Sequence, residues 1–103
     1  MNIPKTVRVG WKVYDVEVVT PNTLEDDTHA ARVHHFPKKI FISDAHDEDQ
    51  QFASFIHELV HCIFWQAGNE KHEDEWIIQC ITNGLMSLLK DNPSLFCEAA
   101  KGE

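Results

Sequence analysis

Residues 51–65 read QFASFIHELVHCIFW, and the segment His57-Glu58-Leu59-Val60-His61 stands at their centre. Apolar residues on both sides of this segment recur at spacings of three and four, which predicts a helix with a buried face. Because positions four apart lie on one face of a helix, the imidazoles of His57 and His61 face the same way. Two imidazoles so placed can bind one ion, and zinc accepts nitrogen ligands in a tetrahedral shell.

Glu58 follows the first of these histidines and is offset around the helix. From there its carboxylate reaches a water at the metal without binding the metal itself, which is the role of the glutamate in the H-E-x-x-H pattern. The alternative is a helix that carries these residues by chance, because five-residue patterns are not highly specific. The apolar flanks favour the metal site, since a charged Glu58 in a core is costly unless it is paired or faces a cleft. The sequence therefore predicts a zinc-binding helix.

Length and composition are those of a single globular domain with a modest core. The net charge of −8 argues against a nucleic-acid-binding surface, because phosphates would repel it. No apolar run approaches the length of a membrane span, and the N-terminus does not read as a secretory signal. Three cysteines are an odd number and are typical of reduced thiols rather than of a disulfide framework. These features favour a cytoplasmic protein that binds neither nucleic acid nor membrane.

The predicted fold class is α+β, with a short N-terminal sheet over about residues 5–43 and two long packed helices after it. Alternation of apolar and polar residues predicts three or four strands in an antiparallel or mixed sheet. The polar segment 23–31 is expected to be a loop. The strands are predicted at 6–10, 11–20, 32–36 and 39–43.

The motif helix is predicted over 47–67. Asp47 is a good N-cap with Gln50 as its capping-box partner, and Gly68 ends the helix. A second helix is predicted over 70–91, because its apolar residues recur at helical spacing and Pro93 stops it. The tail over 93–103 is expected to be loosely held, with at most a last turn around Leu95 and Phe96.

Two histidines do not complete a catalytic zinc site, which normally has three protein ligands and a water. Candidates for the third ligand stand where the second helix begins: His72, Glu73, Asp74 and Glu75. Helical phase puts Asp74 near the middle of the apolar stripe and Glu73 and Glu75 on its flanks, so phase does not separate these two glutamates. A bland explanation for most of the cluster is that acidic side chains complement the N-terminal helix dipole.

The order of the segments resembles a known family. The quoted segments are Ile40-Phe41-Ile42, then residues 57–61, then Glu75-Trp76-Ile77-Ile78-Gln79, then Leu85-Met86-Ser87-Leu88-Leu89. This arrangement is similar to small zincin-type metallopeptidases of phages and prophages, which are related to the ImmA/IrrE metallopeptidase family. The resemblance covers residues 39–92 well and the N-terminal strands more loosely. It implies a gluzincin-like domain in which the third zinc ligand is a glutamate of the following helix, here Glu75. Gln79 departs from the Asp or Asn that the family often has four residues after that glutamate.

The resulting hypothesis is a zinc metallopeptidase in which His57, His61 and Glu75 hold one zinc ion per chain. Glu58 is the general base for water attacking a peptide carbonyl. The substrate is expected to be an intracellular protein of phage or host, bound in extended form along the strand Lys39–Ser43, which is taken as the sheet edge nearest the metal. The developing oxyanion needs a further donor, and the sequence does not rank the candidates. These candidates are Tyr14, His34, His35 and His72.

Two other functions remain as alternatives. A catalytically silent zinc-binding protein would bind a partner through its acidic surface, and the net charge of −8 and the lack of a substrate domain favour it. Glu58 argues against it, because a structural zinc site closes its shell with a fourth protein ligand and needs no base. A zinc hydrolase that acts on something other than peptides is the third and weaker hypothesis.

Overall fold

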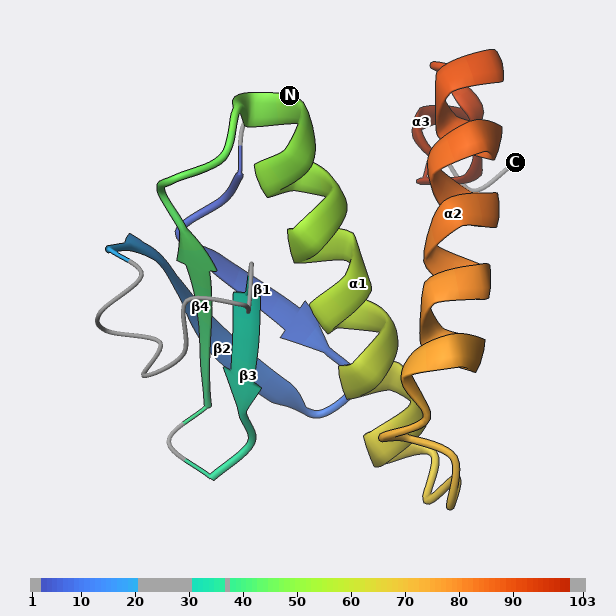
Figure 1. The fold of residues 1–103 in the computed structure, drawn as a ribbon. Helices are drawn as coiled ribbons and strands as arrows, with labels where there is room; N and C mark the ends of the chain where they lie inside the picture. The colour runs from blue at the N-terminus through green and yellow to red at the C-terminus, as the bar shows by residue number, and fades with distance from the viewer. Residues whose placement is uncertain (1–2, 21–30, 37, 101–103) are drawn as a thin grey trace.

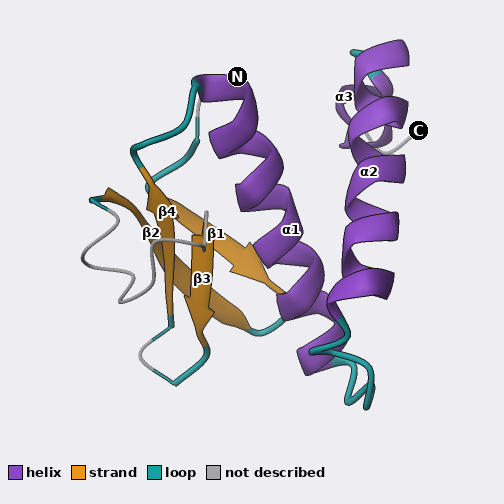
Figure 2. Cartoon of the chain, in the orientation of Figure 1, coloured by secondary structure: helices purple, strands orange, loops and turns teal. Residues whose placement is uncertain are grey.

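The computed structural model describes residues 3–20, 31–36 and 38–100 (Figure 1). Within these ranges a four-stranded sheet is followed by two long helices and one short helix, which confirms the predicted α+β class. The helix α1 lies between the sheet and α2 (Figure 2). None of the helices in these ranges has both the length and the apolar character needed to cross a bilayer. The elements are β1 (Thr6–Val9), β2 (Lys12–Val19), β3 (Ala31–His34), β4 (Lys39–Ser43), α1 (Glu48–Gln66), α2 (Glu75–Asp91) and α3 (Leu95–Ala100).

The sheet is mixed, with strand order β1-β2-β4-β3. β1 and β2 form an antiparallel hairpin in which Val9 pairs with Lys12. Its two-residue turn needs Gly10, which has a φ of +59° and whose added Cβ would collide with the side chain of Gln66. β4 pairs in parallel with β2 and antiparallel with β3. Most of the loop predicted for 23–31 lies outside the described residues, and Ala31 already belongs to β3.

The strand order corrects the prediction that Lys39–Ser43 is a sheet edge. β4 has the predicted bounds, but it lies between β2 and β3, so both of its sides are already paired. Among the described strands, β3 is the outer one on this side of the sheet. Alternation of apolar and polar residues predicts strands but not their order in the sheet. In the structure Ile40 and Ile42 of β4 are completely buried, as expected of an internal strand.

One face of the sheet packs against α1. Tyr14 of β2 and Ile40 and Ile42 of β4 are fully buried and form the core together with Phe55 and Cys62 of α1. Side chains at alternate positions of β2 and β4 point to this face, which follows from the strand period of two. The apolar stripe predicted for the motif helix is therefore partly its contact with the sheet.

The boundaries of α1 follow from its caps. The carboxylate of Asp47 accepts a hydrogen bond of 2.8 Å from the backbone N–H of Gln50, which confirms the predicted N-cap. The side chain of Gln50 does not return the bond of a capping box, because its Nε2 donates to Ser54 Oγ at 3.1 Å. Gly68 follows the last turn with a φ of +71°, as expected of a residue that ends a helix.

The second helix begins later than predicted, at Glu75 instead of residue 70. Asp74 is its N-cap, because the Asp74 carboxylate accepts a hydrogen bond from the backbone N–H of Ile77. Propensity did not separate residues 70–74 from the helix, and the cap residue sets the boundary. In the tail, residues 95–100 form the short helix α3, which begins where a last turn around Leu95 and Phe96 is predicted.

The cap of α1 yields a stability prediction. Asp47→Ala removes the acceptor for the Gln50 N–H and is expected to lower the free energy of unfolding by about 1 kcal/mol. Asp47→Asn keeps an acceptor at the same place and is expected to change it little. Urea unfolding followed by circular dichroism measures both, and equal midpoints for Asp47→Ala and the unaltered protein would contradict the cap.

Candidate metal centre

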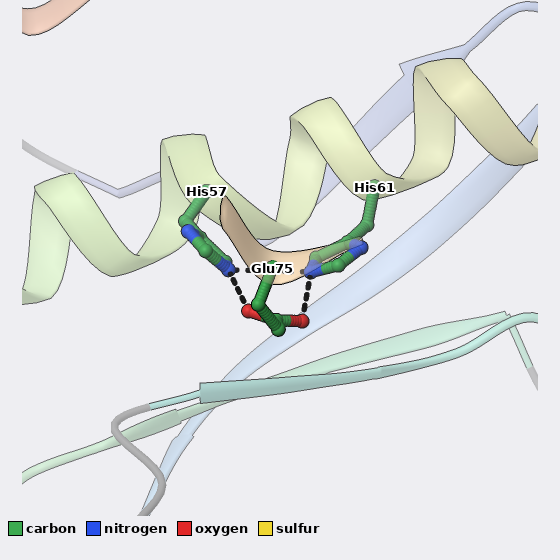
Figure 3. A group of neighbouring side chains, drawn as sticks. All are labelled: His57, His61 and Glu75. Carbon is green, nitrogen blue, oxygen red and sulfur yellow. Dashed lines mark hydrogen bonds and ion pairs between the residues drawn. The ribbon is translucent and has the colours of Figure 1, made fainter. Parts of the chain in front are cut away.

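Two side chains of α1 and the first residue of α2 meet beside each other (Figure 3). His57 Nε2 lies 2.9 Å from Glu75 Oε2, and His61 Nε2 lies 2.8 Å from Glu75 Oε1. The two Nε2 atoms are 3.2 Å apart. One ligand atom from each residue lies within 4.8 Å of the others, so His57, His61 and Glu75 form a group that could hold a metal ion.

Local structure explains why these three side chains converge. Residues 57 and 61 lie one turn apart on α1, where their rings face the same side. The turn over 69–74 reverses the chain, and the Asp74 cap then places Glu75 at the first position of α2. The three atoms come from segments whose backbones are fixed by helix hydrogen bonds.

The structure separates Glu75 from the other candidates for a third ligand. Asp74 is occupied as the cap of α2. His72 contributes its backbone carbonyl, which accepts a hydrogen bond of 2.6 Å from His61 Nδ1. Glu73 lines the neighbouring cleft but is not part of the group.

The hydrogen bond to His72 determines the state of the His61 ring. A carbonyl oxygen can only accept, so His61 Nδ1 carries the hydrogen and the neutral ring has its lone pair on Nε2. That lone pair faces the Glu75 carboxylate at 2.8 Å. Two lone pairs at this distance repel each other unless a cation, either a proton or a metal ion, lies between them. A backbone carbonyl on the far nitrogen is also the usual outer partner of a metal-binding histidine.

Glu58 lies on α1 next to the group but outside it, and only 6% of its surface is exposed. Burial raises the pKa of Glu58 to about 7; the His61 ring opposes this shift, the Glu75 carboxylate adds to it, and Arg32 opposes it. Glu58 Oε2 is one of the buried side-chain atoms that have no hydrogen-bond partner among the described residues. A buried carboxyl in this state can take up and release a proton near neutral pH.

His61 and Glu75 of the group line a cleft of about 360 Å³ between the outer strand β3 and the helices. Three consecutive residues of β3 border it. The lining residues are Ala31, Arg32, Val33, His35, Glu58, His61, His72, Glu73 and Glu75.

The cleft divides the four residues predicted as oxyanion donors. His35 and His72 line it. Tyr14 is fully buried and reaches only as far as His35, whose Nδ1 lies 3.0 Å from the Tyr14 hydroxyl. His34 is on the opposite face of the sheet, where its ring contacts Phe41 with centroids 5.6 Å apart.

Lys12 is a residue of this region that the sequence interpretation missed. Only 6% of it is exposed, and its Nζ donates to the backbone carbonyl of His35 at 2.8 Å. The ammonium also lies 4.4 Å from the centroid of the Trp65 ring. The available signal was its position, because Lys12 is at an inward-facing site of β2 in the same alternation as Tyr14 and Val16.

No family model, curated protein or solved structure matched the chain. The assignment of a function therefore depends on the site itself.

Metal content tests the group directly. The protein equilibrated with zinc is expected to hold about one zinc ion per chain after dialysis, as measured by elemental analysis. Loss of an outer-shell partner costs 10- to 100-fold in metal affinity, so Glu75→Ala, which removes a direct ligand, is expected to cost at least about 100-fold.

Glu73→Ala is the matched control, because Glu73 lies two residues before Glu75 and lines the cleft without belonging to the group. It is expected to bind zinc as the unaltered protein does. Full zinc binding by Glu75→Ala would show that another residue completes the site.

Proposed function

We propose that this protein is a zinc-dependent metallopeptidase of the gluzincin type. The observation that carries the proposal is a group of three residues that could hold an ion, His57, His61 and Glu75, of which His61 and Glu75 line the same cleft as the buried carboxyl of Glu58. Catalytic zinc sites have three protein ligands and keep one position for water or substrate, whereas structural sites have four. The group contains three residues within the described ranges.

The donor set suits zinc. Two imidazole nitrogens and one carboxylate oxygen are a ligand combination of catalytic zinc in peptidases. The His61 ring already has its proton on Nδ1, which leaves Nε2 free to act as a ligand. When bound, zinc would lower the pKa of a water molecule to about 7 and polarise the substrate carbonyl.

The residues of the chain then perform the proton transfers. The Glu58 carboxylate accepts a proton from the attacking water while the water oxygen forms a bond to the carbonyl carbon, and the carbonyl π electrons move onto its oxygen. Glu58 next gives this proton to the amide nitrogen as the C–N bond breaks, so that a carboxylic acid and an amine leave. A carboxyl whose pKa is raised to about 7 suits both halves of this cycle.

The position of β3 as an outer strand of the described sheet supports an extended peptide as substrate. An edge strand presents unpaired N–H and C=O groups, to which a peptide can add as a further strand. β3 borders the cleft that contains Glu58, so a peptide paired with it would run past the candidate metal group. This replaces β4 as the proposed binding strand. The resemblance to phage and prophage metallopeptidases adds an intracellular protein of phage or host as the substrate class.

A catalytically silent zinc-binding protein is the second candidate. The net charge of −8 supports an acidic surface that binds a partner. If the protein is catalytically silent, Glu58 has no catalytic role that would explain its burial. The burial of its unpaired carboxyl oxygen then only lowers the stability of the fold. The two candidates differ in whether the zinc-loaded protein cleaves peptides.

A Glu58→Gln variant separates them. The amide has nearly the same shape but cannot accept the proton, and general-base catalysis contributes about 10²- to 10⁴-fold, so peptide cleavage is expected to fall by at least about 100-fold while bound zinc is unchanged. Cleavage is measured with a library of quenched fluorescent peptides, beside zinc content.

Glu73→Gln serves as the control, because Glu73 lines the same cleft as an exposed side chain. It is expected to retain activity. Equal cleavage by Glu58→Gln and the unaltered protein would contradict the proposed mechanism. Stoichiometric zinc without any cleavage by the unaltered protein would instead favour the silent candidate.

A further inference from the structure

His35 is held from three directions, although it lies in the turn between β3 and β4. Its ring stacks on Trp65 with centroids 4.2 Å apart and an angle of 5° between the planes. Its Nδ1 lies 3.0 Å from the hydroxyl of Tyr14, and its backbone carbonyl accepts a 2.8 Å hydrogen bond from Lys12 Nζ. Turn residues are usually less restrained than this, so the fold fixes this one ring in place.

The stacking partner places the ring beside the metal group. Trp65 is four residues after His61, which is four residues after His57, so all three lie along one face of α1. The Cα atom of Trp65 lies about 6 Å along the helix axis from that of His61, because four residues separate them, and the His35 ring is stacked on the Trp65 ring. His35 lines the same cleft as Glu58 and His61.

The hydrogen bond with Tyr14 determines which nitrogen of His35 carries the proton. Tyr14 is fully buried, and burial raises its pKa to about 12, so the hydroxyl stays protonated and needs an acceptor. The side chains of Gln66 and Cys62 also lie beside this hydroxyl. The Gln66 amide lowers the pKa of Tyr14, as a donor to the hydroxyl oxygen does, and the sulfur of Cys62 is a weak acceptor. His35 Nδ1 is the better acceptor. A neutral ring that accepts at Nδ1 has its hydrogen on Nε2.

The surroundings of His35 favour the neutral form of the ring. Burial lowers its pKa, and the positive charge of Lys12 lowers it further, as do His72 and His61, against the opposing effect of Glu73. A neutral ring with one fixed N–H is a directed hydrogen-bond donor. It can stabilise a developing negative charge by hydrogen bonding, without transferring its own proton.

We propose that His35 is a catalytic residue of this site, whose Nε2–H donates a hydrogen bond to the substrate oxygen as the carbonyl carbon becomes tetrahedral. This inference rests on the proposed peptidase function. Tyr14 and Lys12 are positioning residues, the first through the ring and the second through the backbone carbonyl. His35 keeps its proton throughout, while the water proton follows the path through Glu58.

His72 is the competing donor in the cleft, and the structure favours His35 over it. The His72 carbonyl holds His61, but within the described ranges the His72 ring makes no hydrogen bond or ring contact of its own. A donor must be positioned before the reaction to stabilise an oxyanion effectively. Of these two histidine rings, His35 is the one that meets this condition.

The test uses the full chain loaded with zinc. The first measurement is the tautomer of His35 from imidazole ¹⁵N chemical shifts, which is expected to show a neutral ring with its proton on Nε2 in the unaltered protein and a mixed population in Tyr14→Phe.

The second measurement is the affinity for N-phosphoryl-leucyl-phenylalanine, whose tetrahedral phosphorus imitates the tetrahedral carbon. His35→Phe keeps an aromatic ring for Trp65 but removes the N–H, and loss of one such donor costs about 10²-fold or more, so this variant is expected to bind the probe at least about 100-fold more weakly. Its zinc content is expected to be unchanged.

His34→Phe is the control, because the adjacent ring lies outside the cleft, and it is expected to bind the probe normally. A proton on Nδ1 of His35, or a doubly protonated ring at pH 7, overturns the inference whether or not the protein is a peptidase. Normal probe binding by His35→Phe, or loss of zinc from it, overturns it as well. If the unaltered protein binds zinc but not the probe, the proposed peptidase function fails, and this inference fails with it.

Discussion

The hydrogen bond from His61 Nδ1 to the backbone carbonyl of His72 is the contact on which the site depends. It fixes the proton of His61 away from the metal group and turns the Nε2 lone pair toward Glu75. It also fastens the turn over residues 69–74 to α1. That turn ends at the cap of α2, so the same hydrogen bond helps to set where Glu75 lies. One backbone carbonyl thus orients one candidate ligand and anchors the segment that supplies another.

The packing of α1 and the position of β3 hold the surroundings of this contact in place. α1 is packed on the buried face of the sheet, so its two histidines cannot shift without disturbing the core. The parallel pairing of β2 with β4 leaves β3 as the outer strand, and β3 forms the opposite wall of the cleft. Lys12 joins these parts, because its ammonium contacts Trp65 of α1 and the carbonyl of His35 after β3. The cleft is therefore bounded by elements that share one core, which suits a site that must hold its geometry.

Local signals predicted much of this structure, and long-range pairing accounts for most of what they missed. Asp47 identified the start of α1 because a cap depends on a few neighbouring residues, and the spacing of His57 and His61 placed both rings on one face for the same reason. Strand order depends on contacts between distant segments, so the alternation in residues 39–43 did not show that β4 is internal. Helical phase left Glu75 undecided, and the family resemblance selected it. The role of the His72 carbonyl carried no side-chain signal at all.

X-ray absorption at the zinc edge of the loaded protein tests the central claim most directly, because it reports the ligands of the ion itself. The account predicts two imidazole ligands with Zn–N distances of about 2.0–2.1 Å, with carboxylate and water oxygens completing a shell of four or five. Glu75→Ala should remove this signature. A shell that contains sulfur at about 2.3 Å, or one made of oxygens alone, would contradict the metal centre formed by His57, His61 and Glu75.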